Sequence, residues 1–283
     1  MPDERPGPIL ITGVNSGIGL AALLRFASGG WEVWGTVRSE DKAAVVTDAA
    51  EAAGVSHLVH PVVLDVSDHE AVVAAWPDFP PFYGVINNAG SSSMGAVEEV
   101  SPKDAKALLD VNLVAPAVVS ACALPAMRER GSGRIIMISS MYGRAAVVPF
   151  NGWYHASKFG LEGLSDVLRM EVAGFGVKVS IIEPGVFKTE IDARAKEAFG
   201  HRASIATSPY QGGYERSERM MGVGGQLGLP ADLLARVIVA AVESRRPLRR
   251  YLVGVDAMAL VAAQAVLPRA VLDASARFMM GLG

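Results

Sequence analysis

The chain has 283 residues, of which 51% are hydrophobic and 19% charged, and its formal net charge is −3. This composition is typical of a folded protein with a large apolar core and excludes a disordered chain. The slightly acidic balance argues against nucleic acid as a partner. The single cysteine, Cys122, excludes an intramolecular disulfide and a cysteine-based metal centre. The polar, proline-rich start (MPDERPGP) does not resemble a signal peptide, and the sequence predicts no membrane span, so we expect a cytoplasmic protein.

Apolar runs of strand length alternate with helical patterns along most of the chain. We expect strands at Pro8–Ile11, Glu32–Val37, Leu58–Leu64, Gly84–Asn87, Arg134–Ser139, Val177–Glu183 and Arg250–Val255. We expect helices at Leu20–Ala27, Asp41–Ala53, Asp68–Trp76, Lys103–Arg130, Gly152–Gly174 and Leu229–Ser244. Strands separated by helices predict a parallel, doubly wound α/β sheet that is covered on both faces, as a single domain spanning residues 1–283.

Two segments fit this pattern less well. Residues 190–228 are rich in glycine, serine and methionine with short helical patches, which predicts a substrate-binding loop or lid. The apolar tail 257–283 is interrupted by Pro268 and predicts one or two amphipathic helices that cover the body or a partner subunit. Attachment to a membrane surface is the alternative for this tail, although only Arg269 and Arg277 in it are basic.

A glycine-rich turn, Thr12 to Gly19 (TGVNSGIG), joins the first strand to the first helix. Glycines at such a turn let the backbone approach a pyrophosphate, and the following helix N-terminus offers free N–H groups and partial positive charge. A glycine motif in this strand–turn–helix setting predicts a dinucleotide site. The alternative is a glycine-rich turn with a structural role alone.

Tyr154 and Lys158 lie four residues apart, which places them one turn apart on the same face of the expected helix. A nearby ammonium stabilises a phenolate and lowers the pKa of the tyrosine, so the pair is suited to proton transfer with an alcohol or ketone oxygen. Many such pairs are surface neighbours. This pair accompanies the glycine turn, the run NNAG, Asn112, the pair Ser139–Ser140 and the segment PGVFKT.

This ordered set of motifs resembles the short-chain dehydrogenase/reductase family over nearly the whole chain, with a stretch after Tyr154 closest to the hydroxysteroid and retinol dehydrogenase branch. The resemblance implies a single-domain Rossmann-type fold with about seven strands in the order 3-2-1-4-5-6-7. It implies Tyr154 as general acid/base, Lys158 as the group that binds the nicotinamide ribose, Ser140 as the substrate-oxygen donor and Asn112 as holder of a relay water. Ser140 lies fourteen residues before Tyr154, one more than is usual in the family, and Ser139 is the alternative.

The resemblance also implies the cofactor site. Asp65 and Val66 correspond to the adenine contact, Asn88 to Gly90 to the run that braces the sheet, and Pro184 to Thr189 to the segment that holds the carboxamide. The expected cofactor residues are Gly13, Asn15, Ser16, Gly17, Ile18, Gly19, Arg38, Asp65, Val66, Asn88, Ala89, Gly90, Tyr154, Lys158, Pro184, Gly185, Val186 and Thr189. We expect no metal.

The residue at the end of the second strand governs cofactor choice, because an acidic residue there would bind the ribose hydroxyls of NAD. Val37 and Arg38 occupy that place. An arginine can bind a 2′-phosphate, so the sequence favours NADP(H) over NAD(H). The alternative for Arg38 is a solvated surface side chain.

We therefore expect an NADP(H)-dependent oxidoreductase that interconverts an alcohol and a ketone or aldehyde, on a small-molecule substrate that is bulky and apolar. An NAD-preferring dehydrogenase and a non-catalytic nicotinamide-binding sensor are the alternatives. The family resemblance implies a homo-dimer or homo-tetramer.

Overall fold

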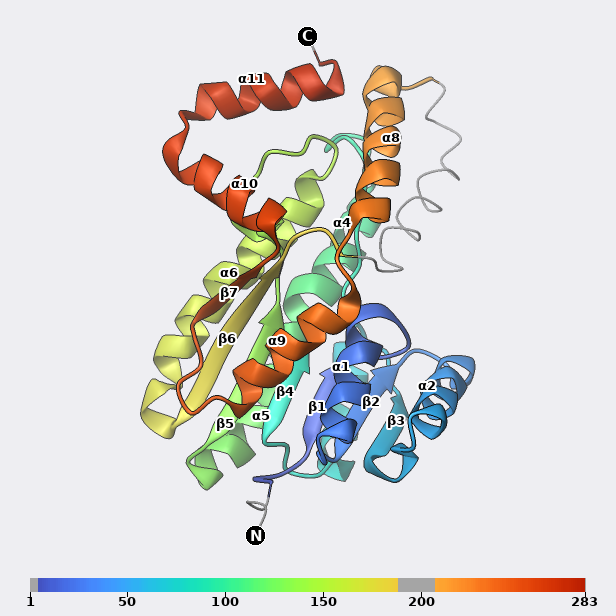
Figure 1. Cartoon of the computed structure of the whole chain (residues 1–283), viewed down its shortest axis with the longest axis vertical. Helices are drawn as coiled ribbons and strands as arrows, with labels where there is room; N and C mark the ends of the chain where they lie inside the picture. Colours follow the sequence, from blue (N-terminus) through green and yellow to red (C-terminus); the bar gives the residue numbers. More distant parts are fainter. Residues whose placement is uncertain (1–4, 188–206, 283) are drawn as a thin grey trace.

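The computed structural model describes residues 5–187 and 207–282, and for residues 221–227 it describes the backbone alone. Its centre is a parallel sheet of seven strands (Figure 1). The strands are β1 (Ile9–Thr12), β2 (Val33–Val37), β3 (Val59–Val63), β4 (Gly84–Asn87), β5 (Gly133–Ile138), β6 (Val177–Pro184) and β7 (Arg250–Val253). Their order is β3-β2-β1-β4-β5-β6-β7, which confirms the predicted topology.

Helices cover both faces of this sheet (Figure 1). One face carries α1 (Gly17–Ser28), α2 (Glu40–Ala52) and α9 (Ala231–Glu243). The other carries α3 (His69–Ala75), α4 (Pro102–Leu109), α5 (Ala115–Arg130) and α6 (Gly152–Glu171). Each parallel connection therefore passes through a helix, as the alternating pattern in the sequence predicts.

The core consists of two apolar layers, one on each side of the sheet. In β1, Ile9 and Ile11 belong to the layer under α1 and α9, whereas Leu10 belongs to the layer under α5 and α6. This alternation follows from the two-residue period of a strand. Because both faces are buried, β1 reads in sequence as the continuous apolar run ILIT.

The region expected to be an irregular loop contains a longer helix than the sequence indicates. Helix α8 covers Gln211–Leu227, while residues 188–206 lie outside the described part of the chain. Gly212 and Gly213 make its first turn a poor helix former. Packing overrides this weak propensity, because Tyr214 and Ser217 are buried and α8 lies against the C-terminal helix.

The apolar tail forms two helices, α10 (Val255–Val266) and α11 (Arg269–Met280). They are separated at Leu267 and Pro268, where the sequence places the break. Helix α11 crosses above the carboxyl ends of the strands toward α8 (Figure 1). The tail therefore lies at the carboxyl-end edge of the sheet, where the predicted site also lies.

Within the described residues, the helical stretch Pro102–Arg130 is long and apolar enough to cross a membrane. It includes α4 and α5, and 44% of its most apolar window is buried in the fold. Val119, Ala123 and Met127 of this stretch belong to the core layer against β4 and β5. Its apolar composition is thus accounted for by packing against the sheet.

Truncating the core residue Phe26 to alanine should lower the free energy of unfolding by about 3–5 kcal/mol. The Phe26 side chain is fully buried, and its ring packs edge-on against Trp31 at a centroid distance of 6.0 Å. Urea unfolding of the native protein and of Phe26→Ala measures the change. The matched control is Phe278→Ala, because Phe278 is 86% exposed and its loss should change stability by less than about 0.5 kcal/mol. Equal effects of the two variants would contradict the assignment of the core.

Candidate active site

The glycine turn has the tight geometry that a dinucleotide site requires. Gly13 and Gly17 have φ angles of +71° and +57°, a region that favours glycine. A Cβ atom on Gly19 would lie 2.2 Å from the Gly13 carbonyl oxygen and 2.5 Å from Nδ2 of Asn88. The N-terminus of α1 follows directly, with Ser16 as its N-cap and no side-chain capping bond. The first backbone N–H groups of a helix have no partner within the helix, so this terminus could bind an anion; the cofactor role of Asn15 to Gly19 stays a prediction.

The run after β4 braces this turn. The Thr12 hydroxyl accepts hydrogen bonds from the backbone N–H groups of Asn88 and Ala89, at 3.0 and 2.9 Å. The Asn88 amide Nδ2 donates to the carbonyl oxygens of Thr12 and Gly13, both at 2.9 Å. The expected bracing role of this run is thus visible in the geometry. A Cβ atom on Gly90 would lie 3.2 Å from Oδ1 of Asn112, so Gly90 lets the two loops approach closely.

The ends of β2 and β3 carry the residues expected to bind the adenosine. Val37 is buried and Arg38, which follows directly, is exposed. In the described part of the chain the Arg38 guanidinium has no recorded hydrogen bond or ion pair, so it is available to an anionic ligand. Asp65 is exposed and its Oδ1 accepts from the N–H and hydroxyl of Ser67 at 2.9 and 2.7 Å. The next helix is capped by Asp68, so Asp65 is not needed as its cap.

Lys158 is a buried ammonium at the centre of the site. It lies on α6, its Nζ donates to the Ile138 carbonyl oxygen at 2.9 Å, and Nζ is 5.8 Å from the Tyr154 ring centroid. Burial lowers the pKa of Lys158 to about 8, and the nearby charge of Glu162 counters part of this fall. A lysine with this pKa remains largely charged at neutral pH and can stabilise a phenolate at Tyr154.

Asn112 joins the loop after β4 to the catalytic helix. Its Nδ2 donates to the Ser91 carbonyl oxygen at 2.8 Å and to the Ser157 hydroxyl at 3.0 Å, while its Oδ1 accepts from the Ser91 N–H. Asn112 lies in a π-helical turn, Asp110–Val114, between α4 and α5. The sequence predicts one continuous helix there, and π turns of this kind often occur at functional sites. The turn points the buried Asn112 amide toward α6.

The structure distinguishes the two serines at the end of β5. The Ser140 hydroxyl accepts from the Tyr142 N–H at 3.1 Å and caps a 3-10 turn, Met141–Gly143. The Tyr142 ring lies edge-on to Tyr154, with 6.4 Å between the ring centroids. Ser139 instead lies beside Gly143, where an added Cβ would be 2.7 Å from its hydroxyl oxygen. Ser140 is thus the serine bonded to the residue that contacts Tyr154, and its role toward a substrate stays a prediction.

His155 has a structural place beside the site. Its Nδ1 lies 3.0 Å from the Tyr142 carbonyl oxygen, and burial lowers its pKa. The contact holds the His155 ring against the turn that follows Ser140.

The segment after β6 contacts a residue that the sequence motifs do not indicate. The Val186 N–H donates to Oδ2 of Asp256 in the first turn of α10, at 2.6 Å. A Cβ atom on Gly185 would lie 2.3 Å from Oδ1 of the same carboxylate. Pro184 ends β6 at the edge of the site, and Thr189 lies outside the described residues. The sequence could not predict this role of Asp256, because its partner Val186 is 70 positions away along the chain.

An apolar cluster lies at the same edge of the sheet. Met94 and Phe150 pack with Tyr214 of α8 and Met280 of α11, and Val148 packs against them. The Tyr214 hydroxyl accepts from the Ala96 N–H at 2.7 Å and bonds the carboxylate of Glu99. No sequence motif indicates Tyr214, because its hydrogen-bond partners Ala96 and Glu99 are 118 and 115 positions away. Phe187 packs into the core layer under α1 and α9 and does not belong to this cluster.

The glycine-rich turn after β1 and the Tyr154–Lys158 pair on α6 lie in one doubly wound fold. Together they define the class of the protein, a nicotinamide-dependent oxidoreductase. The chain belongs to the short-chain dehydrogenase family, whose sequence profile matches residues 8–199. This membership confirms the predicted family and the predicted enzyme class, an NAD(P)-dependent oxidoreductase acting on CH–OH groups.

Three known proteins illustrate the similarity. Human retinol dehydrogenase 5 is 32% identical over 286 residues, covering 94% of this chain and 86% of the relative, which agrees with the branch that the motifs indicate. The structure of a short-chain dehydrogenase from Streptomyces avermitilis is 27% identical with a TM-score of 0.74, covering 99% of this chain and 100% of the other. A metagenomic short-chain oxidoreductase in complex with NADP is 25% identical with a TM-score of 0.68, covering 88% and 96%.

Replacing Gly19 with alanine should weaken binding of NADPH by at least about tenfold, equivalent to ~1.4 kcal/mol. The added Cβ would overlap the Gly13 carbonyl oxygen and Asn88, so the turn must shift away from the helix N-terminus. Fluorescence titration with NADPH measures the loss. The matched control is Gly163→Ala on α6, because a Cβ there meets nothing within 4 Å. Native affinity in Gly19→Ala would show that the turn does not bind the pyrophosphate.

Proposed function

We propose that this protein interconverts an alcohol and a ketone or aldehyde with NADP(H), through Tyr154 as the general acid/base. The observation that carries the proposal is the buried ammonium of Lys158, 5.8 Å from the Tyr154 ring. The glycine cradle, the N-terminus of α1 and Arg38, which forms no ion pair among residues 5–187 and 207–282, fit a phosphorylated dinucleotide. When bound, the nicotinamide supplies the hydride acceptor or donor.

Each residue of the site has a distinct part in this proposal. Tyr154 gives a proton to the carbonyl oxygen during reduction and takes it from the alcohol during oxidation. Lys158 stabilises the phenolate and binds the nicotinamide ribose. Ser140 donates a hydrogen bond to the substrate oxygen, where negative charge develops. Asn112 holds α6 against the loop after β4 through Ser91 and Ser157, and holds a water that reaches Lys158.

Tyr154→Phe tests this role, because phenylalanine keeps the ring and removes the proton. Turnover should fall by about 10²–10⁴-fold, while the affinity for NADPH should stay within about threefold of native. Steady-state rates with apolar ketones and fluorescence titration measure the two quantities. The matched control is Tyr83→Phe, because Tyr83 stacks on Trp31 in the core. Native turnover in Tyr154→Phe would exclude Tyr154 as the acid/base. Absence of turnover in the native protein, together with intact binding of NADPH, would favour the non-catalytic sensor.

The preference for NADP(H) rests on Arg38. The residue is exposed at the end of β2, after the buried Val37, where a carboxylate would be needed for the ribose of NAD. The metagenomic relative binds NADP with the same fold. A charge-assisted bond from the guanidinium to the 2′-phosphate would supply the discrimination. An NAD-preferring dehydrogenase is the alternative.

Arg38→Asp should reverse this preference. The carboxylate repels a 2′-phosphate and accepts hydrogen bonds from ribose hydroxyls, so NADPH affinity should fall by about tenfold or more while NADH affinity rises. Fluorescence titration with both nucleotides measures the ratio. Arg236→Asp on α9 serves as a control for the change in net charge, since its side chain is exposed and pairs with Asp232. An unchanged ratio in Arg38→Asp would exclude Arg38 as the phosphate ligand.

The apolar cluster of Met94, Phe150, Tyr214 and Met280 favours a bulky apolar substrate. The similarity to a retinol dehydrogenase supports the same choice. The proposed partners are this small molecule and further copies of the chain, in a homo-dimer or homo-tetramer. A cytoplasmic location is consistent with the single cysteine.

A further inference from the structure

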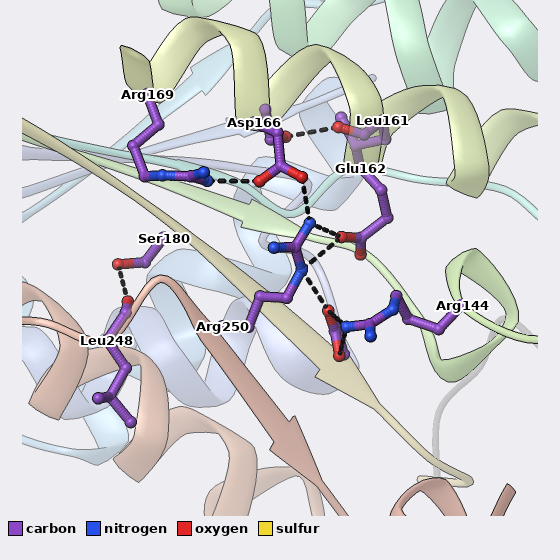
Figure 2. Close-up of polar contacts among 10 residues, drawn as sticks. Arg144, Leu161, Glu162, Asp166, Arg169, Ser180, Leu248 and Arg250 are labelled. Atoms are coloured by element: carbon purple, nitrogen blue, oxygen red, sulfur yellow. Dashed lines mark hydrogen bonds and ion pairs between the residues drawn. The ribbon is translucent and has the colours of Figure 1, made fainter. Parts of the chain in front are cut away.

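Arg250 of β7 is the centre of a partly buried ionic cluster beside the catalytic helix (Figure 2). Its Nε lies 3.1 Å from Glu162 Oε2 and 3.0 Å from Glu183 Oε1, and its Nη2 lies 2.6 Å from Asp166 Oδ2. The side chains of Glu162 and Glu183 are buried, with exposed fractions of 7% and 1%. One guanidinium therefore joins the edge strand to α6 and β6.

Two further arginines complete the cluster. Arg144, in the loop after Ser140, lies 3.2 Å from Glu183 Oε1, and Arg169 lies 2.5 Å from Asp166 Oδ1 (Figure 2). Three guanidinium groups thus face three carboxylates. The ion pairs of Arg144 and Asp166 are more than a third exposed and therefore add little to stability. The buried carboxylates of Glu162 and Glu183, in contrast, need a charged partner, and Arg250 is that partner for both.

Glu162 is the member of this cluster that lies next to the catalytic residues. It follows Lys158 by four residues, so both lie on the same buried face of α6. A Cβ atom on Gly143 would lie 3.1 Å from both Glu162 Cγ and the Lys158 carbonyl oxygen, which shows how tightly the turn packs here. In so enclosed a region a charge acts more strongly than at the surface.

We propose that Glu162 is a positioning residue for the reaction: its carboxylate, held by Arg250, keeps Lys158 in the ammonium form that supports Tyr154. The inference rests on the proposed function, in which Lys158 stabilises the phenolate. Arg250 contributes by holding the carboxylate in the charged form. The last strand of the sheet thereby acts on the catalytic tyrosine through two intermediate side chains.

The charges around Glu162 agree with this role. The groups that face it are Lys158 and Asp166 on α6, Ser139 at the end of β5, Glu183 on β6, Arg250 on β7 and, through Glu183, Arg144. Burial raises the pKa of Glu162 and Glu183 adds to the rise, whereas Ser139 and Arg250 lower it. Burial lowers the pKa of Lys158 to about 8, and Glu162 raises it. Loss of the Glu162 charge should therefore lower the pKa of Lys158 further.

Glu162→Gln tests the proposal, because glutamine keeps the shape and removes the charge. We would follow the Lys158 side-chain signal against pH by NMR in the protein without cofactor, assigning it by its loss in Lys158→Met. The midpoint should fall by about one pH unit from its native value. In the assay, the alkaline limit of alcohol oxidation should move to lower pH by the same amount, because the phenolate loses the ammonium sooner.

Asp166→Asn is the matched control. Asp166 also binds Arg250, but it is one turn further along α6 and its side chain is 36% exposed, so the Lys158 midpoint should stay at the native value. Glu162→Asp keeps the charge and should retain a midpoint closer to native than Glu162→Gln does. This variant also tests the proposal if glutamine prevents folding, since a midpoint lowered by a full unit would then contradict it.

The outcomes separate this inference from the proposed function. An unmoved midpoint in Glu162→Gln, or an equal shift in Asp166→Asn, overturns the role of Glu162 even if Tyr154→Phe is inactive. If the Lys158 midpoint falls in Glu162→Gln but Tyr154→Phe keeps native turnover, the coupling between Glu162 and Lys158 stands. The proposed function is then overturned.

Discussion

The site depends on one buried cation, the ammonium of Lys158. Removing an ammonium from water is costly, so the fold must provide polar partners for it. The Ile138 carbonyl oxygen at the end of β5 accepts its hydrogen bond, and Glu162 provides opposite charge from the next turn of α6. These contacts fix α6 against the end of β5. Tyr154, one turn earlier on the same helix, is thereby held beside the ring of Tyr142, whose N–H binds Ser140.

Parallel topology brings the remaining groups to the same edge. The glycine turn follows β1, the bracing run with Asn88 follows β4 and Pro184 ends β6. These features could be predicted from sequence, because each is a local signal: a strand pattern followed by a short motif. The strand order was available through the family resemblance, and the alternation of Ile9, Leu10 and Ile11 between the two core layers follows from strand geometry.

Other features had no local signal. The bond between Asp256 and Val186 and the ion pairs of Arg250 with Glu162 and Asp166 join residues 70 or more positions apart, so only the folded chain shows them. The residues of the π turn at Asp110–Val114 are compatible with an ordinary helix. The sequence therefore predicts a helix there but does not show that this turn contains an extra residue. The helical extent of α8 was missed because its glycines disfavour a helix in isolation, while packing of Tyr214 stabilises it.

The family profile ends at residue 199, yet residues beyond it complete the site. Arg250 binds the carboxylate of Glu162, which follows Lys158 by one helical turn. Asp256 accepts a hydrogen bond from the Val186 N–H. Tyr214 packs against Phe150 in the apolar cluster. The shared part of the chain thus supplies the cradle and the proton-transfer pair, which the general chemistry requires. The C-terminal part supplies Arg250, which binds Glu162, and the residues Tyr214 and Met280 of the apolar cluster. Residues 207–282 therefore act on the site from outside the profile, through the partner of Glu162 and through the apolar surface, while the profile region holds the groups that the general chemistry needs.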